Sequence, residues 1–253
     1  MAGHEFSVAI LVFFLLSGAG LASLLLHRKL PDRYRQDDTA AIIRMVANVF
    51  VVVTSLVLGL MVNSAKNTFE TADRDVHAIA TEIILLDKLL RRFGEAGDEV
   101  RRDLLNYVKQ ASAVARTKAN GLADSSQRGE DLLDRAGESL RAITPTSGAQ
   151  MALWEQALTK YQAVFDLRWK LVQQADGTIP SALLAMVVLW LALIFGSFGY
   201  RAPANFIVVL SILLAAALMA ATIYLIVDMD VPFGGPMSVS RGPIDRVLAA
   251  LSR

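Results

Sequence analysis

Polar side chains at helical spacing lie in the second long apolar run of the sequence and directly after it. The face that they share holds three polar and three aliphatic residues: Asn48, Ser55 and Asn63, and Val52, Leu56 and Leu60. It is polar at its ends and aliphatic in the middle. If several copies surrounded an axis, the aliphatic side chains would form stacked rings, which can gate ions by dewetting. The same spacing also fits asparagines that hydrogen-bond neighbouring helices while the aliphatic side chains face lipid.

A second group of chemically distinctive residues follows the fourth apolar run, in the segment VDMDVPFGG (227–235). It contains Asp228, Asp230, Pro232, Phe233 and Gly235. The proline ends a helix because it lacks an N–H, and the glycines permit a turn. Carboxylates are mildly unfavourable at the C-terminal end of a helix, where the dipole is negative. A simple helix ending therefore does not explain the two aspartates.

Residue patterns typical of enzymes are absent from the sequence. The histidines His4, His27 and His77 are scattered, there is no cysteine, and no phosphate-binding loop or nucleophile elbow occurs. We therefore expect neither an enzyme, nor a metal site, nor another cofactor. The formal net charge of +1 comes without a basic stripe, which argues against a nucleic-acid partner.

Four apolar stretches are long enough to cross a hydrocarbon core of roughly 30 Å, which takes about 20 helical residues. They cover approximately residues 6–26, 42–62, 179–198 and 204–227, in a chain that is 54% hydrophobic. The first stretch has no Lys or Arg ahead of it and ends in His27-Arg28-Lys29, so we interpret it as a retained anchor. The composition and these spans predict an integral protein of a lipid bilayer.

The polar region between the two pairs of spans has helical periodicity. One apolar stripe recurs at steps of three and four, and a second does so near the end of the region: Val76, Ile79, Ile83, Leu86, Leu90 and Phe93, then Trp154, Leu158, Tyr161, Phe165 and Val172. We predict an all-α fold with a transmembrane pair in 1–62, a helical bundle in 63–178, a second pair in 179–227 and a tail in 228–253.

The second span is expected to continue into the bundle as one helix. No proline and a single glycine occur between Ala41 and Phe93, and such a helix would be about 80 Å long.

Small residues crowd in the first and fourth spans and would let helices approach closely, within one chain or between subunits. They are Ser17, Gly18, Gly20, Ala22 and Ser23, and Ser211, Ala215, Ala216, Ala217, Ala220 and Ala221.

Positive charges predict the orientation of the chain. Arg28, Lys29, Arg33 and Arg35 lie in the loop between the first two spans, and Arg201 lies in the loop between the last two. By the positive-inside rule both loops face the cytoplasm. The helical bundle and both termini are then expected outside.

Three segments resemble bestrophins. LVLGLMVNSAKNTFETADRDV (56–76) resembles the end of their second membrane helix, ADGTIP (175–180) is similar to the Asp…Ile-Pro that opens their third span, and VPFGG (231–235) is similar to the Pro-Phe-Gly after their fourth. A bacterial bestrophin-like group carries Asp-x-Pro-Phe-x-Gly there, matched by Asp230, Pro232, Phe233 and Gly235. The order of spans and helical region is also similar.

Bestrophins are pentameric anion channels, so the resemblance implies a homo-oligomer with a pore lined by the second span. Aligned on Gly59, the narrow neck falls on Val52, Leu56 and Leu60. The segment from Asp228 to Gly235 would be a clasp that turns the tail back against the domain or a neighbouring subunit.

The sequence departs from bestrophins in three respects. Their necks commonly carry aromatic rings, whose positive edges can face an anion, whereas these positions are aliphatic, so an anion is only weakly favoured. No carboxylate follows in 235–240, so no calcium clasp is expected. Bestrophins keep the helical domain in the cytosol, in conflict with the charge pattern.

Two functions remain open from the sequence. The first is a bestrophin-like oligomeric ion channel, or permeation pathway, in a bacterial inner membrane. The second is a non-conducting membrane sensor or scaffold whose helical domain binds a partner, with the long helix transmitting that binding to the spans. The symmetry of the assembled particle separates them, because the sensor is expected to be a monomer or dimer without an axial pore.

Overall fold

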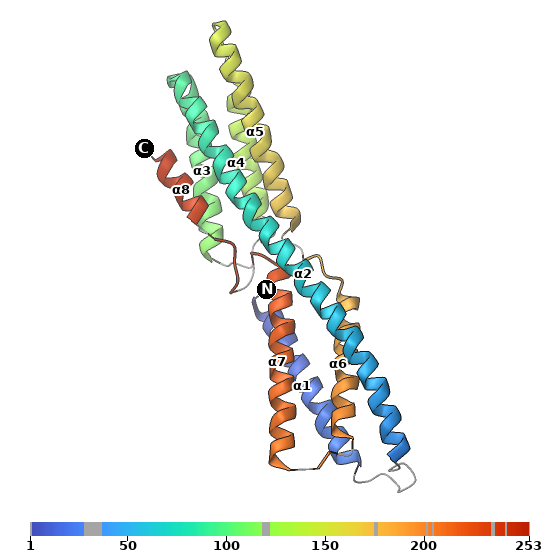
Figure 1. Cartoon of the computed structure of the whole chain (residues 1–253). Helices are drawn as coiled ribbons and strands as arrows, with labels where there is room; N and C mark the ends of the chain where they lie inside the picture. The colour runs from blue at the N-terminus through green and yellow to red at the C-terminus, as the bar shows by residue number, and fades with distance from the viewer. Residues whose placement is uncertain are drawn as a thin grey trace. The chain divides into compact units, whose positions relative to one another are not determined.

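The computed structural model describes residues 2–27, 37–117, 122–174, 177–200, 202–203, 205–233, 236–240 and 242–252, and every regular element in them is a helix (Figure 1). The α-helices are α1 (Ala2–His27), α2 (Asp37–Leu90), α3 (Glu95–Thr117), α4 (Leu122–Ala142), α5 (Gly148–Gln174), α6 (Ser181–Gly199), α7 (Phe206–Asp230) and α8 (Gly242–Leu251). Four of them, α1, α2, α6 and α7, are long and apolar enough to cross a membrane. The predicted all-α membrane fold is confirmed.

The second apolar run and the first bundle helix form one uninterrupted helix, α2, as the sequence predicts. Its single interior glycine, Gly59, has no neighbouring atom within 4 Å of the place where a Cβ would stand, so it marks no close contact within the chain. The helix passes into a 3₁₀ turn, Arg91–Phe93, and ends at Gly94, whose φ of 62° is a left-handed conformation that suits glycine.

The chain divides into two compact units. One consists of residues 1–68 and 177–230, and we call it the membrane unit; the other consists of residues 69–176 and 231–253, and we call it the bundle unit. Helix α2 contributes to both units.

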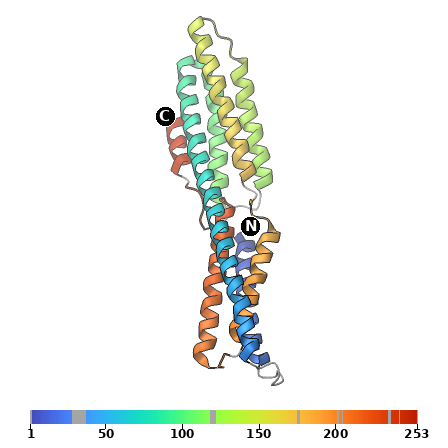
Figure 2. The same ribbon diagram turned by 45° about the vertical axis from the view of Figure 1, so that its right-hand side comes forward.

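In the membrane unit, α1 packs against α6 and α7 (Figures 1 and 2). Glycines lie where these helices approach closely. A Cβ on Gly199 of α6 would collide with the backbone of α1 at Gly20 O and Leu24 N, and one on Gly20 would lie 2.8 Å from Ile212 Cγ2 of α7. Aliphatic side chains fill the rest of the interface, with Leu16, Val187, Ala216, Ile223 and Ile226 fully or almost fully buried. Absent side chains at the glycines let the backbones touch, which is how helices gain van der Waals contact in lipid.

The bundle unit has a core of large aliphatic residues from the second half of α2 and from α3, α4, α5 and α8. The predicted α2 stripe is buried from Val76 to Leu90, whereas Phe93 is only partly buried. In α5 only Tyr161 of the predicted stripe is buried; the buried residues are Ala157, Tyr161, Val164 and Arg168. The Trp154 indole is half-buried and donates its Nε1–H to Leu140 O at 2.9 Å.

A buried carboxylate joins three helices of the bundle unit. Asp87 on α2 accepts hydrogen bonds from Arg91 Nε and Arg101 Nε, each at 2.7 Å, and Arg91 Nη2 also donates to Ala250 O on α8 at 2.9 Å. Both oxygens of the 3% exposed aspartate are thus paired, which removes most of the cost of burying a charge. The network holds the C-terminal helix and the start of α3 to the end of α2.

Candidate functional site: the exposed face of α2 and the buried carboxylate at the end of α7

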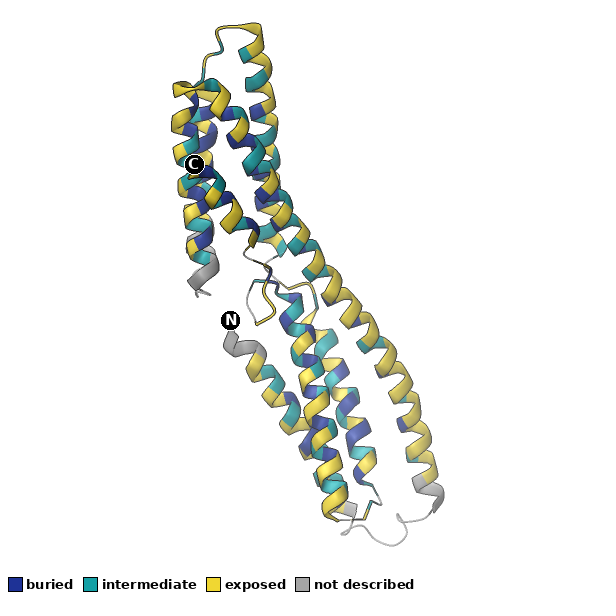
Figure 3. Cartoon of the chain, turned by 60° about the vertical axis from the view of Figure 1, so that its left-hand side comes forward, coloured by how far each residue is buried: buried dark blue, intermediate teal, exposed yellow. Residues whose placement is uncertain are grey.

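The membrane half of α2 is packed on one side only. Its buried residues recur at steps of seven and four: Ala47, Thr54, Met61 and Ala65. Only 17% of the residues in its most apolar window are buried, compared with 33% in α6. Figure 3 shows this as a long exposed stretch on the first half of α2. Most of the helix surface is therefore available to lipid or to another copy of the chain.

The six residues of the predicted pore face all lie in this exposed surface. Val52, Leu56 and Leu60 are 69%, 65% and 62% exposed, and Asn48, Ser55 and Asn63 are also exposed. At 100° per residue they cluster opposite the buried residues of the same helix. Within the described residues, no helix therefore covers this face. A face that lines a central axis must be uncovered in this way.

The polar residues of this face differ in how they are satisfied. Ser55 Oγ donates to Val51 O of its own helix at 2.7 Å, so it needs no external partner. The side chains of Asn48 and Asn63 form no hydrogen bond with the described part of the chain. The sequence pattern allowed two interpretations, and one of them has the asparagines hydrogen-bonded to neighbouring helices. Such bonds do not occur within the described part of the chain.

The predicted C-terminal clasp is split between two environments. Helix α7 extends to Asp230, three residues beyond the predicted end of the span, so Asp228 and Asp230 lie in its last turn, and both are buried. Pro232 is buried and Phe233 is half-buried in the bundle unit, where Phe233 packs near Ala72, Val76 and Val239. Gly235 lies outside the described residues.

Asp230 serves the beginning of α6 rather than the end of its own helix. Its Oδ2 accepts the backbone N–H of Ile179 at 3.0 Å and its Oδ1 accepts the hydroxyl of Thr178 at 2.7 Å. Helix α6 begins after Pro180, and the N-terminal end of a helix is electropositive and leaves backbone N–H groups unpaired. The carboxylate that is unfavourable at the end of α7 is therefore favourable next to the start of α6.

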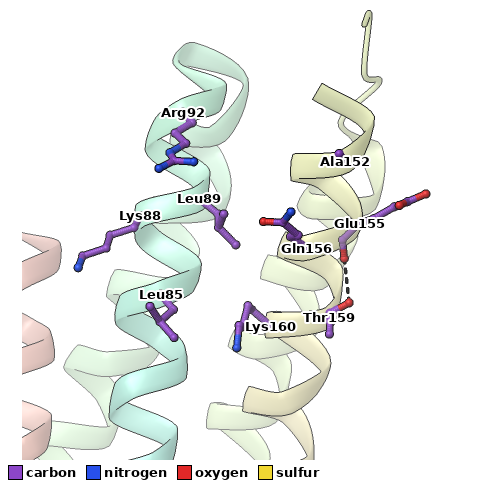
Figure 4. Close-up of a pocket in the computed structure, with 9 residues that line it drawn as sticks. All are labelled: Leu85, Lys88, Leu89, Arg92, Ala152, Glu155, Gln156, Thr159 and Lys160. Atoms are coloured by element: carbon purple, nitrogen blue, oxygen red, sulfur yellow. Dashed lines mark hydrogen bonds between the residues drawn. The ribbon is translucent and has the colours of Figure 1, made fainter. Parts of the chain in front are cut away.

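The bundle unit contains a separate groove between α2 and α5, with a volume of about 610 Å³ (Figure 4). Its lining is Leu85, Lys88, Leu89, Arg92, Ala152, Glu155, Gln156, Thr159 and Lys160. Two of its polar groups are already used, since Lys160 Nζ is 2.9 Å from Glu82 Oε2 and Thr159 Oγ1 donates to Glu155 O at 2.9 Å. It contains no residue of the α2 pore face.

The described residues hold no group of three or more His, Asp or Glu side chains that could bind one metal ion. The polar groups described above hydrogen-bond the chain itself or face outward from α2. The α2 face is exposed, and Asp230 connects the end of α7 to the start of α6.

Comparison with known proteins agrees with this architecture. A family model described as a Bestrophin-like domain matches residues 14–244. No curated protein sequence matches the chain. Crystal structures of two single-substitution variants of a bacterial bestrophin homologue from Klebsiella pneumoniae are similar in fold: one has a TM-score of 0.68 at 14% identity and covers 97% of this chain and 99% of that chain. The other has a TM-score of 0.67 at 13% identity and covers 96% and 97%. The family match covers most of the chain, including the α2 face and Asp230, and the protein therefore belongs to the bestrophin-like family.

Proposed function

We propose that the protein is an oligomeric ion channel of bestrophin type in a bacterial inner membrane, with α2 of each subunit lining the pore. The observation that carries the proposal is the exposed α2 face, with asparagines at both ends that form no hydrogen bond with the described part of the chain. Family membership supports the same function, and it favours a pentamer.

In the proposed pore, Val52, Leu56 and Leu60 form the neck, and Asn48 and Asn63 form polar rings at its two ends. Aliphatic rings exclude water when the pore is narrow and admit it when the pore widens, so they gate without choosing the sign of the ion. Amide groups offer both donors and acceptors, so they too can contact ions of either sign. We infer that anions permeate, as in the bestrophins that the sequence resembles, and that selectivity is modest.

The decisive experiment is electrical. We expect the purified protein to conduct in planar bilayers, and Leu56→Ala to raise conductance or leak, because shortening the side chain widens the neck and eases wetting. The matched control is Leu218→Ala on α7: Leu218 is 60% exposed and Leu56 is 65% exposed, so both substitutions remove similar exposed area. The control should leave the current unchanged.

Two results would contradict the channel. One is the absence of current under every ionic condition from protein shown to be incorporated. The other is an equal change of the current in Leu56→Ala and Leu218→Ala. Leu56 would then behave like an exposed leucine outside the pore. Electron microscopy tests the assembly independently, and we expect five-fold particles with α2 nearest the axis. A monomer or dimer without an axial pathway would favour the sensor or scaffold.

A further inference from the structure

The carboxylate of Asp230 connects two helices of the membrane unit, because it binds residues that lie 51 and 52 positions earlier in the sequence. Asp230 is 5% exposed, and both of its oxygens are engaged by the residues just ahead of α6: Oδ1 by Thr178 Oγ1 at 2.7 Å and Oδ2 by Ile179 N at 3.0 Å. Hydrogen bonds to an ionised acceptor are short and stronger than neutral ones. The end of α7 and the start of α6 are therefore held in one position by directional contacts.

The chain of hydroxyls continues to α2. Thr178 Oγ1 lies 3.4 Å from Thr68 Oγ1, and Thr68 Oγ1 lies 3.2 Å from Ser64 O of its own helix. A hydroxyl has a single proton, and Thr178 gives its proton to Asp230, so Thr68 is the only one of the two threonines that can donate in the 3.4 Å contact. The single proton of the Thr68 hydroxyl thus has two possible acceptors, Ser64 O at 3.2 Å and Thr178 Oγ1 at 3.4 Å. The second contact is the longer one, and its length depends on the position of α2.

Thr68 lies at a sensitive place on α2. It follows Asn63 by five residues and Leu60 by eight. Thr68 and Leu60 are therefore about 12 Å apart along the helix. The neighbouring buried contacts of α2, at Met61 and Ala65, are apolar and non-directional, so they resist separation more than rotation or sliding. The polar contact of Thr68 with Thr178, at 3.4 Å, lies just beyond the predicted pore mouth and depends on the rotation and the height of α2.

We propose that Asp230 and Thr178 are positioning residues that set the rotation of α2 beside the pore mouth, and that Thr68 is the point where α2 receives this constraint. The inference rests on the proposed function, because the constrained face is the predicted pore lining. Loss of the link changes the balance between open and closed states. It leaves the neck side chains, and hence single-channel conductance, as they were.

The test compares hydroxyl removal with hydroxyl retention. Thr178→Val keeps the shape of the side chain but leaves Asp230 Oδ1 without its donor, whereas Thr178→Ser keeps the donor. We expect Thr178→Val to shift the open-to-closed ratio by about twofold to tenfold, the range of one net hydrogen bond. Thr178→Ser should stay close to wild type, and single-channel conductance should be the same in all three proteins.

A second variant keeps the inference testable if Thr178→Val fails to fold. Thr68→Val removes only the α2 end of the link and leaves Asp230 fully paired. Its control is Thr81→Val, because Thr81 Oγ1 makes the same bond to its own helix, to His77 O at 2.9 Å. Thr68→Val should shift gating and Thr81→Val should not. Equal gating in both variants, or a changed conductance in Thr68→Val, would overturn the inference.

A readout without current separates this inference from the channel proposal. The chain has no cysteine, so Leu60→Cys provides a single thiol on the α2 face. We expect Thr68→Val to change the rate of thiol modification in membranes by at least twofold, and Thr81→Val to leave it unchanged. A wild-type protein without current would refute the channel, whereas equal modification rates would refute the link.

Discussion

Buried polar side chains in the bundle unit have specific partners that define their roles. Asp87 pairs with two arginines, and the Arg101 guanidinium, hydrogen-bonded to Asp87, has a raised pKa. The Tyr161 hydroxyl donates to Leu133 O at 3.1 Å, and burial raises the pKa of this side chain. Burial also raises the pKa of Tyr107 to about 12, partly offset by the nearby Arg168 cation. The raised pKa values of these tyrosines predict that the stability of the protein depends on pH in the alkaline range.

Tyr107 is expected to cause loss of stability above pH 10. In the unfolded chain its hydroxyl ionises near the ordinary pKa of 10.0, while in the folded protein it keeps its proton until about 12. The stabilisation is complete below pH 10 and is lost as pH rises towards 12, at up to about 1.4 kcal/mol per pH unit. We predict that Tyr107→Phe unfolds at a temperature that falls less steeply than that of wild type between pH 9 and 11. Parallel melting curves of the two proteins across this range would contradict the prediction.

At the scale of elements, two glycines lie where the backbones of α1 and α6 come close together. The sequence singles out small residues in the first and fourth spans, including Gly20, but the backbone that meets Gly20 belongs to Gly199 in the third span. In α5, likewise, most of the large apolar side chains of the predicted stripe are only partly buried. The buried face of the helix includes Ala157 and Arg168, which the stripe does not contain. Periodicity finds the side of a helix that is buried, whereas the residue at its centre depends on the neighbour.

A side chain at Gly199 is expected to separate α1 from α6. A Cβ there would overlap Gly20 O and come within 2.8 Å of Leu24 N, and backbone atoms of a helix cannot move away as a flexible side chain can. We predict that Gly199→Leu destabilises the protein by about 3 kcal/mol or more. The measurement is the melting temperature in detergent together with the fraction of monodisperse protein.

Gly196 provides the control on the same helix. No atom lies within 4 Å of the position that its Cβ would take, so Gly196→Leu should be tolerated. If both leucine variants were equally stable, close contact of the α1 and α6 backbones would not be needed for the fold.

At the scale of the whole molecule, the chain has the spans, the long α2 and the helical bundle that place it in the bestrophin-like family. The side of the membrane that the bundle faces is a separate property. The Arg and Lys residues of the first connection predict a cytoplasmic loop, so the C-terminus is expected outside. The resemblance to bestrophins implies the opposite orientation.

Reporter fusions at the C-terminus distinguish these orientations. We predict that alkaline phosphatase fused after Arg253 is active and that a fluorescent protein at the same place is dark, because each reporter matures on one side only. Replacing Arg28, Lys29, Arg33 and Arg35 together by Gln should weaken this preference. A bright, phosphatase-negative fusion would show that the orientation of bestrophins outweighs the charge pattern.

The sequence alone determined the properties that depend on local pattern. Four apolar runs of sufficient length predicted the membrane helices, and a stretch with one glycine and no proline predicted the continuous α2. A single face of α2 could also be chosen from residue spacing, because side-chain direction along a helix follows from its geometry. Whether that face lines a pore is still a prediction.

Only the tertiary structure decided which distant groups meet. The clasp that would turn the tail stays a prediction, but the partners of the Asp230 carboxylate, Thr178 and Ile179 about 50 residues earlier, appear only in the folded chain. Likewise, the partner of Gly20 and the absence of a bonding partner for Asn48 and Asn63 in the described part of the chain depend on how helices pack. Hydrogen bonds and close contacts act over a few ångströms in space, whatever the separation along the chain, so spacing in sequence cannot identify them.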